Sequence, residues 1–309
     1  MYYKYSDFLK KRYGQKVYKI PVNLPLTCPN RDGTIGVCGC SFCADVGTGF
    51  ESLPSDMPIV DQIENNIAYI GKKYKSLLYI IYFQNFSNTY MPLQDFKKML
   101  KAIPKRGDIV GVSISTRPDL IREDYLKAAE DLGIDIYFEL GLQSVNYKTL
   151  KKINRGHTLA EFIDSVYRIK QHGFFVCAHV ILNLPWDDLE DVIECAKIVS
   201  ALRVDLVKLH SLYIMQNTAL GDLYQKGEIK LISCDEYIER IIIFLEYLKK
   251  DIAVERLISR APQEGSLFVN WGIGSYTLSN MIEKQLENEN CQQGKKCNYL
   301  GGQLLEKFD

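Results

Sequence analysis

Short apolar runs rich in β-branched and aromatic residues alternate with longer segments of helical periodicity through most of this chain. The runs that predict strands are Val17–Leu26, Leu77–Phe83, Ile109–Ile114, Ile134–Leu142, Phe174–Leu182 and Val204–Leu209. The segments that predict helices are Ile59–Tyr74, Pro92–Ile103, Glu123–Leu132, Leu159–His172 and Leu189–Leu202. Strands that alternate with helices indicate βαβ units and a parallel sheet, and right-handed crossovers curl such a sheet towards a barrel. The sequence therefore predicts an α/β fold built on a partial (β/α)6 barrel.

The remainder of the 309-residue chain is mainly helical from about Gln216. Helical patterns cover Leu220–Tyr224, Cys234–Lys250 and Ser275–Leu286, and the apolar run Ile252–Ile258 fits either a seventh strand or a sheet edge. No linker rich in proline, glycine or serine divides the chain, and no internal repeat is visible. We therefore expect residues 1–215 to form the barrel and residues 216–309 to form a helical extension packed on the same domain.

Charge and composition narrow the class of protein. Lys+Arg and Asp+Glu are balanced at 38 each, so no overall field attracts nucleic acid, and basic residues gather only locally, as at Lys72–Lys75 and Lys97–Arg106. The N-terminus lacks an apolar signal segment and no run is long enough to span a bilayer, so we expect a cytoplasmic protein with no membrane association. In a reducing cytoplasm, clustered cysteines indicate metal binding or catalysis rather than disulfides.

Polar side chains follow the predicted strands at the points where the strands end. Catalytic groups of parallel β/α barrels lie at these C-terminal ends. The side chains concerned are Cys28, Gln84, Asn85, Ser115, Arg117, Gln143 and His210, while Glu139 and His179 lie within otherwise apolar strands. An ionisable group inside a buried strand is costly unless it is paired or used. These residues therefore predict one polar rim, although His179 also fits a hydrogen-bonded histidine of the core.

Cys28, Cys38, Cys40 and Cys43 form the densest group of potential metal ligands in the chain. Four interpretations are compatible with it: a structural zinc site with four thiolates, a redox CxxC of the thioredoxin type, a [4Fe–4S] electron carrier with four cysteines, and a [4Fe–4S] cluster with three cysteines and one open iron. Cys40 and Cys43 form a CxxC, whose two thiolates can bind one metal centre from a single turn. Spacing alone favours zinc, because paired cysteines are common zinc ligands.

Several ordered motifs carry a resemblance to a known family. They are Thr27–Gly33 (TCPNRDG), Ser115–Asp119 (STRPD), Glu139–Ser144 (ELGLQS), Ile153–Thr158 (INRGHT) and Val176–His179 (VCAH). Together with a first strand that leads into Cys28 and the CxxC, they resemble the radical S-adenosylmethionine (radical SAM) superfamily, and within it the Elp3-like branch. The spacing of eleven residues between Cys28 and Cys40 is similar to that of a small bacterial group of this branch.

The resemblance implies that Cys28, Cys40 and Cys43 hold a [4Fe–4S] cluster whose fourth iron binds S-adenosylmethionine, from which a deoxyadenosyl radical is made. It also implies that the residues at the family's cofactor positions are Gln84, Asn85, Ser115, Arg117, Glu139, Gln143, Arg155 and His179. Gln143 and Arg155 match positions that meet the ribose and the carboxylate of the cofactor. The loop Gln84–Thr89 departs from the family's Gly-Gly-Glu form, and Ser115 replaces a common glutamate. Cys38 is extra to the pattern, while Cys291 and Cys297 are expected to be ordinary thiols.

The resemblance also indicates a class of substrate, because the Elp3-like branch acts largely on tRNA. Our leading hypothesis is removal of the carboxymethyl group from a carboxymethylaminomethyl-uridine at the wobble position, which leaves aminomethyl-uridine. The partners implied are tRNA and an electron donor such as flavodoxin or ferredoxin. Two alternatives are radical chemistry on a small molecule, as in the oxygen-independent coproporphyrinogen oxidases, and a non-catalytic RNA-binding protein stabilised by zinc.

Overall fold

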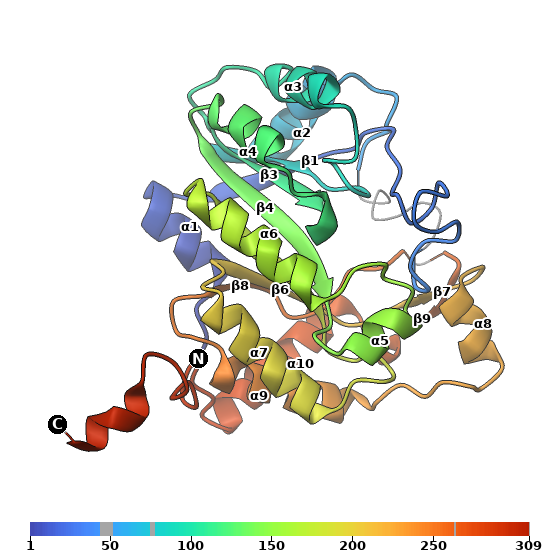
Figure 1. The fold of residues 1–309 in the computed structure, drawn as a ribbon, viewed down its shortest axis with the longest axis vertical. Coiled ribbons are helices and arrows are strands. Elements are labelled where there is room, and N and C mark those ends of the chain that lie inside the picture. Colours follow the sequence, from blue (N-terminus) through green and yellow to red (C-terminus); the bar gives the residue numbers. More distant parts are fainter. Residues whose placement is uncertain (44–51, 75–77, 263, 309) are drawn as a thin grey trace.

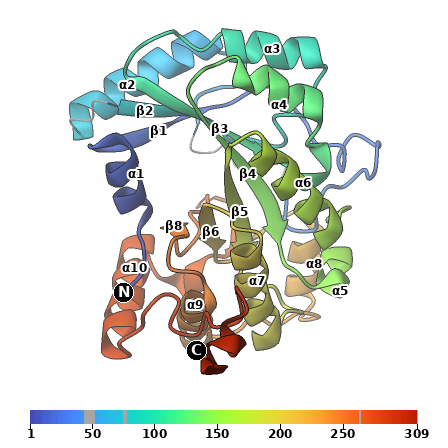
Figure 2. The same cartoon turned by 60° about the vertical axis from the view of Figure 1, so that its left-hand side comes forward.

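The computed structural model describes residues 1–43, 52–74, 78–262 and 264–308. Its main sheet has seven parallel strands in the order β1-β2-β3-β4-β5-β6-β8. Their bounds are β1 (Val17–Val22), β2 (Leu78–Phe83), β3 (Ile109–Thr116), β4 (Asp135–Gln143), β5 (Phe175–Ile181), β6 (Leu206–His210) and β8 (Ala253–Arg256). The sheet curves around an interior, and its two edge strands β1 and β8 do not pair with each other in the described part of the chain (Figures 1 and 2). The predicted partial α/β barrel is confirmed, while Leu77, expected to begin the second strand, lies outside the described residues.

The helices on the outer side of the sheet each connect one strand to the next. They are α2 (Ile59–Tyr74), α3 (Leu93–Lys101), α4 (Glu123–Glu130), α6 (Leu159–Gln171) and α7 (Leu189–Ala201). Two of them begin at a capping box, in which the N-cap side chain and the third helical residue satisfy each other's backbone N–H groups: Thr158 with Glu161 in α6, and Asp188 with Asp191 in α7. These caps set the helix starts that the apolar periodicity had predicted.

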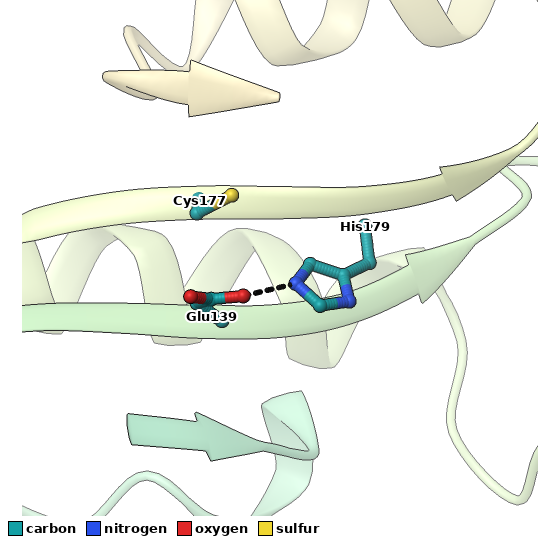
Figure 3. A group of neighbouring side chains, drawn as sticks. All are labelled: Glu139, Cys177 and His179. Carbon is teal, nitrogen blue, oxygen red and sulfur yellow. Dashed lines mark hydrogen bonds and ion pairs between the residues drawn. The ribbon is translucent and has the colours of Figure 1, made fainter. Parts of the chain in front are cut away.

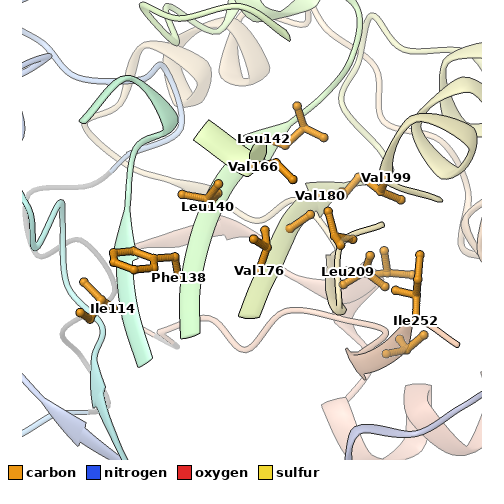
Figure 4. Close-up of a cluster of buried hydrophobic side chains, with 14 of the residues drawn as sticks. Ile114, Phe138, Leu140, Leu142, Val166, Val176, Val180, Val199, Leu209 and Ile252 are labelled. Atoms are coloured by element: carbon orange, nitrogen blue, oxygen red, sulfur yellow. The ribbon is translucent and has the colours of Figure 1, made fainter. Parts of the chain in front are cut away.

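Alternation along the strands separates an outer apolar layer from an inner polar one. In β4, Phe138, Leu140 and Leu142 belong to the large hydrophobic cluster that fills the space between sheet and helices (Figure 4). Successive side chains of a strand point to opposite faces of the sheet. Glu139 and Gly141 therefore face the barrel interior, where both line a cavity.

A helix that the sequence patterns did not predict covers one opening of the barrel. In this helix, α1 (Tyr5–Tyr13), Leu9 packs with Tyr137, Cys177 and Leu206 on the inner face of the sheet. The preceding residue Lys4 forms a β-bridge with Val254, and α1 contacts both β1 and β8. The helix thus covers the opening between the two edge strands, as Figure 2 shows.

The C-terminal part combines helices with one further strand of the main sheet. The run Ile252–Ile258 supplies β8, a seventh strand next to β6. The division at residue 215 stays a prediction.

The other elements, from all parts of the chain, are α5 (Tyr147–Lys152), α8 (Ala219–Gln225), α9 (Cys234–Tyr247), α10 (Ser275–Asn288), the antiparallel pair β7 (Ile214–Met215) and β9 (Ser266–Phe268), and 3-10 turns at Pro118–Leu120, Asn270–Gly272 and Gln303–Phe308. Across the described ranges, none of the helices has the length and apolar character to cross a membrane.

Candidate cofactor and substrate cavity

A cavity of about 1450 Å³ occupies the barrel interior and the C-terminal ends of the strands. It brings together ten of the eleven site residues predicted from the sequence: Cys28, Cys40, Cys43, Gln84, Ser115, Arg117, Glu139, Gln143, Arg155 and His179. The eleventh, Asn85, is buried beside the cavity, and its side-chain amide donates a hydrogen bond to Asn23 Oδ1 at 3.1 Å. A direct contact between Asn85 and a cofactor stays a prediction.

Two asparagines fix the loop that carries the cysteines. Asn30 Nδ2 donates to the backbone oxygen of Asn154 at 2.6 Å, and Asn154 Nδ2 donates to the oxygen of Gly39 at 2.8 Å. Asn154 has a φ of +51°, a left-handed conformation that asparagine tolerates better than most residues. This pair of bonds ties the loop to the segment after α5, so that Cys28, Cys40 and Cys43 line the same cavity.

Two guanidinium groups lie against the thiols of the CxxC. Arg155 Nη1 is 3.4 Å from Cys40 Sγ, and Arg31 Nη1 is 3.6 Å from Cys43 Sγ. Burial, together with the neighbouring thiols of Cys40 and Cys28, nevertheless raises the pKa of Cys43 to about 11. Cysteines bind metal as thiolates, so a metal centre that binds here must displace the thiol protons. Its positive charge would then stabilise the closely spaced thiolates.

The arrangement of the thiols fits an iron–sulfur cluster better than a zinc ion. Tetrahedral zinc with Zn–S bonds of about 2.3 Å requires sulfurs about 3.8 Å apart. Among the described residues, no three of these cysteines bring their sulfurs within 4.8 Å of one another. Cys38 is exposed and does not line the cavity. Three thiols facing one cavity at wider spacing suit a cluster in which each binds a different iron.

The remaining cysteines are separate from this group. Cys177, Cys195 and Cys291 are buried, and Cys297 is half-buried. Cys177 lies in the inner hydrophobic cluster, whereas Cys195 and Cys291 lie in the large outer one. In the parts of the chain that the structure covers, Cys291 and Cys297 belong to no group of three or more metal-ligand atoms. Their role as ordinary thiols stays a prediction.

Gly141 connects the end of β4 to Arg155. Its backbone oxygen accepts hydrogen bonds from Arg155 Nη2 at 2.8 Å and from His157 at 3.1 Å. The register of β4 against β5 shifts between Gly141 and Gln143, and Gln143 has a φ of +71°. Such bulges redirect side chains and are common beside active sites. Here the bulge gives Gln143 a place in the cavity lining next to Arg155.

Replacing Gly141 with alanine is expected to keep the fold but displace Arg155. A Cβ at this position would lie 2.5 Å from Arg155 Nη2 and 2.8 Å from Gln143 Nε2. Both atoms end flexible side chains, so they move rather than the backbone. A shift of about 1 Å beside a reacting centre costs up to about 100-fold in rate. We expect about 10- to 100-fold less 5′-deoxyadenosine from Gly141→Ala, and no loss from Gly107→Ala, whose Cβ meets nothing within 4 Å. Equal activity of both variants would contradict this role.

Arg117, predicted as a cofactor residue, has its donors engaged by the protein. Its Nε and Nη2 donate to the carboxylate of Asp119, and its Nη1 donates to the backbone oxygen of Arg155 at 2.8 Å. These bonds hold the segment that carries Arg155. A direct contact of Arg117 with a cofactor stays a prediction.

A closed ring of four charges crosses the barrel interior below the cysteines. Lys19 Nζ lies 2.6 Å from both Glu139 and Glu255, and Lys208 Nζ lies 2.7 Å from Glu139 and 2.8 Å from Glu255. Burial by itself would raise the pKa of Glu139, but Lys19 and Lys208 outweigh it and hold that pKa well below its usual value. The ring is neutral as a whole and joins β1, β4, β6 and β8.

Glu139, Cys177 and His179 bring potential ligand atoms within 4.8 Å of one another. Figure 3 draws their side chains on β4 and β5. The carboxylate is already saturated, since Oε1 accepts from Lys19 and Ser113 and Oε2 accepts from Tyr82, Lys208 and His179. Burial and Lys208 lower the pKa of His179 to about 4, so its ring is neutral near pH 7. The two neighbouring ammonium groups would repel a cation. This group is therefore part of the ion-pair network and not a metal site.

The outer rim of the cavity has a distinct composition. Its exposed lining residues in the described part of the chain comprise tyrosines, basic residues and serines, with no carboxylate: Ser6, Lys16, Tyr69, Lys73, Tyr74, Arg260, Ser275 and Tyr276. Tyr69, Lys73 and Tyr74 come from α2 and Tyr276 from α10, two helices that flank α1 at the open side of the barrel (Figure 2). Lys73 Nζ lies over the rings of both Tyr69 and Tyr74.

Comparison with known proteins agrees with this geometry. The chain is similar to YtqA of Bacillus subtilis, with 32% identity over 95% of this chain and 92% of that protein. It is also similar to the tRNA uridine(34) acetyltransferase of Methanocaldococcus jannaschii, with 26% identity over 61% of this chain and 34% of that protein. A solved structure of Elp3 from Methanocaldococcus infernus shares the fold, with a TM-score of 0.69 and 19% identity, and the match covers 94% of this chain and 67% of that one.

Two family profiles match successive parts of the chain. The Radical SAM superfamily matches residues 26–199, which include the three cavity-lining cysteines, Gln143 and Arg155. The Radical_SAM C-terminal domain matches residues 204–288, which include β6 and β8. The chain therefore belongs to the radical SAM superfamily, whose enzymes bind a [4Fe–4S] cluster and S-adenosylmethionine.

Proposed function

We propose that this radical SAM enzyme acts on tRNA and removes the carboxymethyl group from a carboxymethylaminomethyl-uridine at the wobble position, leaving aminomethyl-uridine. The observation that carries the tRNA assignment is the rim of the cavity, which combines exposed tyrosines with basic side chains. The tyrosines are Tyr69, Tyr74 and Tyr276, and the basic residues are Lys16, Lys73 and Arg260. Unpaired RNA bases are bound by stacking on aromatic side chains, while basic residues meet the phosphates. A wobble base is unpaired and protrudes from a loop, so it suits such a rim.

The comparisons support the same class of substrate. One relative is named for its action on uridine 34 of tRNA, and the match to it covers 61% of the chain described here. That stretch corresponds to only 34% of the relative, so the likeness does not extend over the whole of that enzyme. We place the reaction in the cytoplasm, where tRNA and low-potential electron carriers such as flavodoxin and ferredoxin are found.

In this proposal the three cysteines Cys28, Cys40 and Cys43 hold the cluster, and Gln84, Asn85, Ser115, Arg117, Glu139, Gln143, Arg155 and His179 surround S-adenosylmethionine and the reacting carbon. When bound, the cofactor pair supplies a 5′-deoxyadenosyl radical that removes a hydrogen atom. The protein positions the reactants and excludes water from them. Arg155 suits the carboxylate of S-adenosylmethionine because it is buried, cationic and in contact with Cys40.

The substrate carbon suited to this chemistry lies between a nitrogen and a carboxylate, which together stabilise a radical there. With the cofactors bound, the radical chemistry they supply would remove one hydrogen atom from this carbon, and a carrier of the flavodoxin or ferredoxin type would accept one electron, which would give a carbon–nitrogen double bond. Water adds to this bond and the carbon–nitrogen bond breaks. The products are aminomethyl-uridine and a two-carbon aldehyde acid, so atoms and electrons balance.

The direct test is mass spectrometry of tRNA nucleosides from a strain that lacks this gene and from the same strain with the gene restored. We expect carboxymethylaminomethyl-uridine to accumulate in the deletion and aminomethyl-uridine to return on restoration. Unchanged wobble uridines would exclude this substrate. Purified protein should contain iron and be brown under anaerobic conditions, whereas a colourless protein with zinc would support the non-catalytic alternative.

Substitution at the rim is expected to separate tRNA binding from cofactor chemistry. Tyr69→Ala should lower kcat/KM for tRNA at least about fivefold, because stacking of a base on an aromatic side chain contributes about 1 kcal/mol or more. Cleavage of S-adenosylmethionine without tRNA should not change. A matched control is Tyr167→Ala, since Tyr167 is 64% exposed against 61% for Tyr69 but does not line the cavity. Equal loss in both variants would argue against the rim as the RNA contact.

A further inference from the structure

Arg256 is a cation of the barrel interior that has no carboxylate partner among the described residues. It ends β8, is half-buried and lines the cavity. Lys19 and Lys208 each meet two carboxylates, whereas Arg256 has none within ion-pair distance among the residues that the structure describes. Its Nη2 lies 2.8 Å from Nδ1 of the His210 ring. Its Nε is buried and has no hydrogen-bond partner in the described structure.

A shift of register brings Arg256 into the interior. In the pairing of β6 with β8, Val207 lies opposite Val254, but the next residue, Lys208, lies opposite Arg256. Glu255 is skipped, so the neighbours Glu255 and Arg256 both contribute polar groups to the interior: Glu255 joins the charged ring and Arg256 contacts His210. Regular alternation would send one of the two to the outer apolar layer. Bulges of this kind re-aim side chains beside active sites.

The groups around Arg256 add no negative charge. The four-membered ring already pairs its two lysines with its two glutamates. Burial and the guanidinium of Arg256 lower the pKa of His210 well below its usual value, so that ring is neutral and accepts the hydrogen bond. His179 packs on His210 with ring centres 5.1 Å apart and is bonded to Glu139. A partly buried charge without a counter-ion is less stable than a paired one, and an anionic ligand would supply the missing partner.

This position lies at the same end of the barrel as the cysteines. His210 and Arg256 are the last residues of β6 and β8, and catalytic groups of β/α barrels gather at such ends. Tyr213, on the loop after β6, lines the cavity together with Cys43 and Arg256. An anion on Arg256 would therefore lie inside the cavity that the cysteines also line, close to His210.

We propose that Arg256, supported by His210, is the binding site for the carboxylate of the substrate. This inference rests on the proposed function and adds how the enzyme selects its substrate: the carboxymethyl form carries the anion that Arg256 needs, and the aminomethyl product lacks it. Hydrogen bonds between an arginine and a carboxylate are charge-assisted and directional, so they fix the carbon next to the carboxylate as well as its charge. Loss of that anion after reaction favours release of the product.

The test compares two forms of tRNA with wild-type and variant enzyme. One tRNA carries carboxymethylaminomethyl-uridine, and the other carries the same side chain as its methyl ester. With wild type, esterification should raise KM about 10- to 100-fold, because a charged hydrogen bond is lost. Arg256→Met should raise KM for the free carboxylate by a similar factor and should no longer distinguish it from the ester. Arg256→Lys, which keeps the charge, should recover part of the loss.

Three outcomes overturn the inference. An equal KM of the wild-type enzyme for both tRNAs would show that the enzyme does not recognise the carboxylate, and this comparison needs no variant. A rise of KM for S-adenosylmethionine in Arg256→Met, with KM for tRNA unchanged, would assign Arg256 to the carboxylate of the cofactor. An Arg256→Met enzyme that still prefers the free carboxylate would place the anion site elsewhere. Failure of the proposed function gives a different result, namely no aminomethyl-uridine from wild type with either tRNA.

Discussion

Alanine at Cys28, Cys40 or Cys43 is expected to abolish the iron–sulfur centre and, with it, formation of 5′-deoxyadenosine. Each of these thiols lines the cavity, and each is expected to bind a different iron, so none can replace another. Loss of partners that merely orient metal ligands costs about 10- to 100-fold in affinity or activity, so loss of a ligand should exceed about 100-fold. Iron content, the brown absorbance and deoxyadenosine formed with reductant measure the effect.

Cys38→Ala is the matched control for these variants. Cys38 belongs to the same loop but is exposed and outside the cavity lining. We expect its alanine variant to retain iron, colour and cleavage of S-adenosylmethionine. If Cys38→Ala loses metal as fully as Cys40→Ala does, the centre has four cysteine ligands, and the three-cysteine cluster is wrong.

Glu139→Gln is expected to destabilise the folded protein by about 3–5 kcal/mol, the usual cost of removing one partner from a buried ion pair. The substitution keeps the size of the side chain but leaves Lys19 and Lys208 with Glu255 as their one remaining carboxylate in the ring. The carboxylate of Glu139 also accepts from Ser113, Tyr82 and His179, and it is fully buried. The midpoint of urea unfolding measures the change.

An exposed ion pair provides the control. Asp164 pairs with Arg168 on the surface of α6, where the side chains are 58% and 42% exposed. Because exposed pairs contribute little, Asp164→Asn should shift stability by no more than about 0.5 kcal/mol. If Glu139→Gln lowers the free energy of unfolding by a similarly small amount, the ring of ion pairs does not contribute to the stability of the fold.

The same ring predicts how stability depends on pH. The pKa of Glu139 is held well below the ordinary value of 4.5, mainly because Lys19 and Lys208 outweigh the effect of burial. A carboxylate whose pKa is lowered on folding stabilises the protein above its unfolded pKa and loses that contribution as the pH falls through its folded pKa. Unfolding should therefore become easier below about pH 4.5, and Glu139→Gln should weaken this dependence.

The order of the main elements was predictable because it depends on local periodicity. Helix α2 begins and ends where its apolar spacing predicted, and the six predicted strands all belong to the parallel sheet. Helix α1 was not predicted, although Leu9 closes the bottom of the barrel. Its importance comes from contacts with β1 and β8, which are far from each other along the chain.

Site residues that belong to a motif at the end of a strand could be predicted from the sequence. Ion pairs between residues on different strands could not. Glu139 was recognisable as an ionisable residue in an apolar strand, which must be paired or used. Its partners Lys19 and Lys208 lie 120 and 69 residues away, and no local pattern connects them. Arg256 was not predicted at all, because a regular strand would send either Glu255 or Arg256 outwards.

The sequence by itself predicted the α/β barrel from periodicity and the family resemblance from ordered motifs, because both depend on order along the chain. The resemblance singled out Cys28, Cys40 and Cys43, and their role as the cluster ligands stays a prediction. The tertiary structure brought Cys28, Cys40 and Cys43 to one cavity and left Cys38 exposed outside its lining, and no three of these sulfurs lie within 4.8 Å of one another in the described residues. It also decided that Glu139 belongs to a neutral ring and that Arg256 lacks a carboxylate partner in the described residues. The physical reason is that charges interact through space, and the curvature of the sheet and one shift of register set those distances.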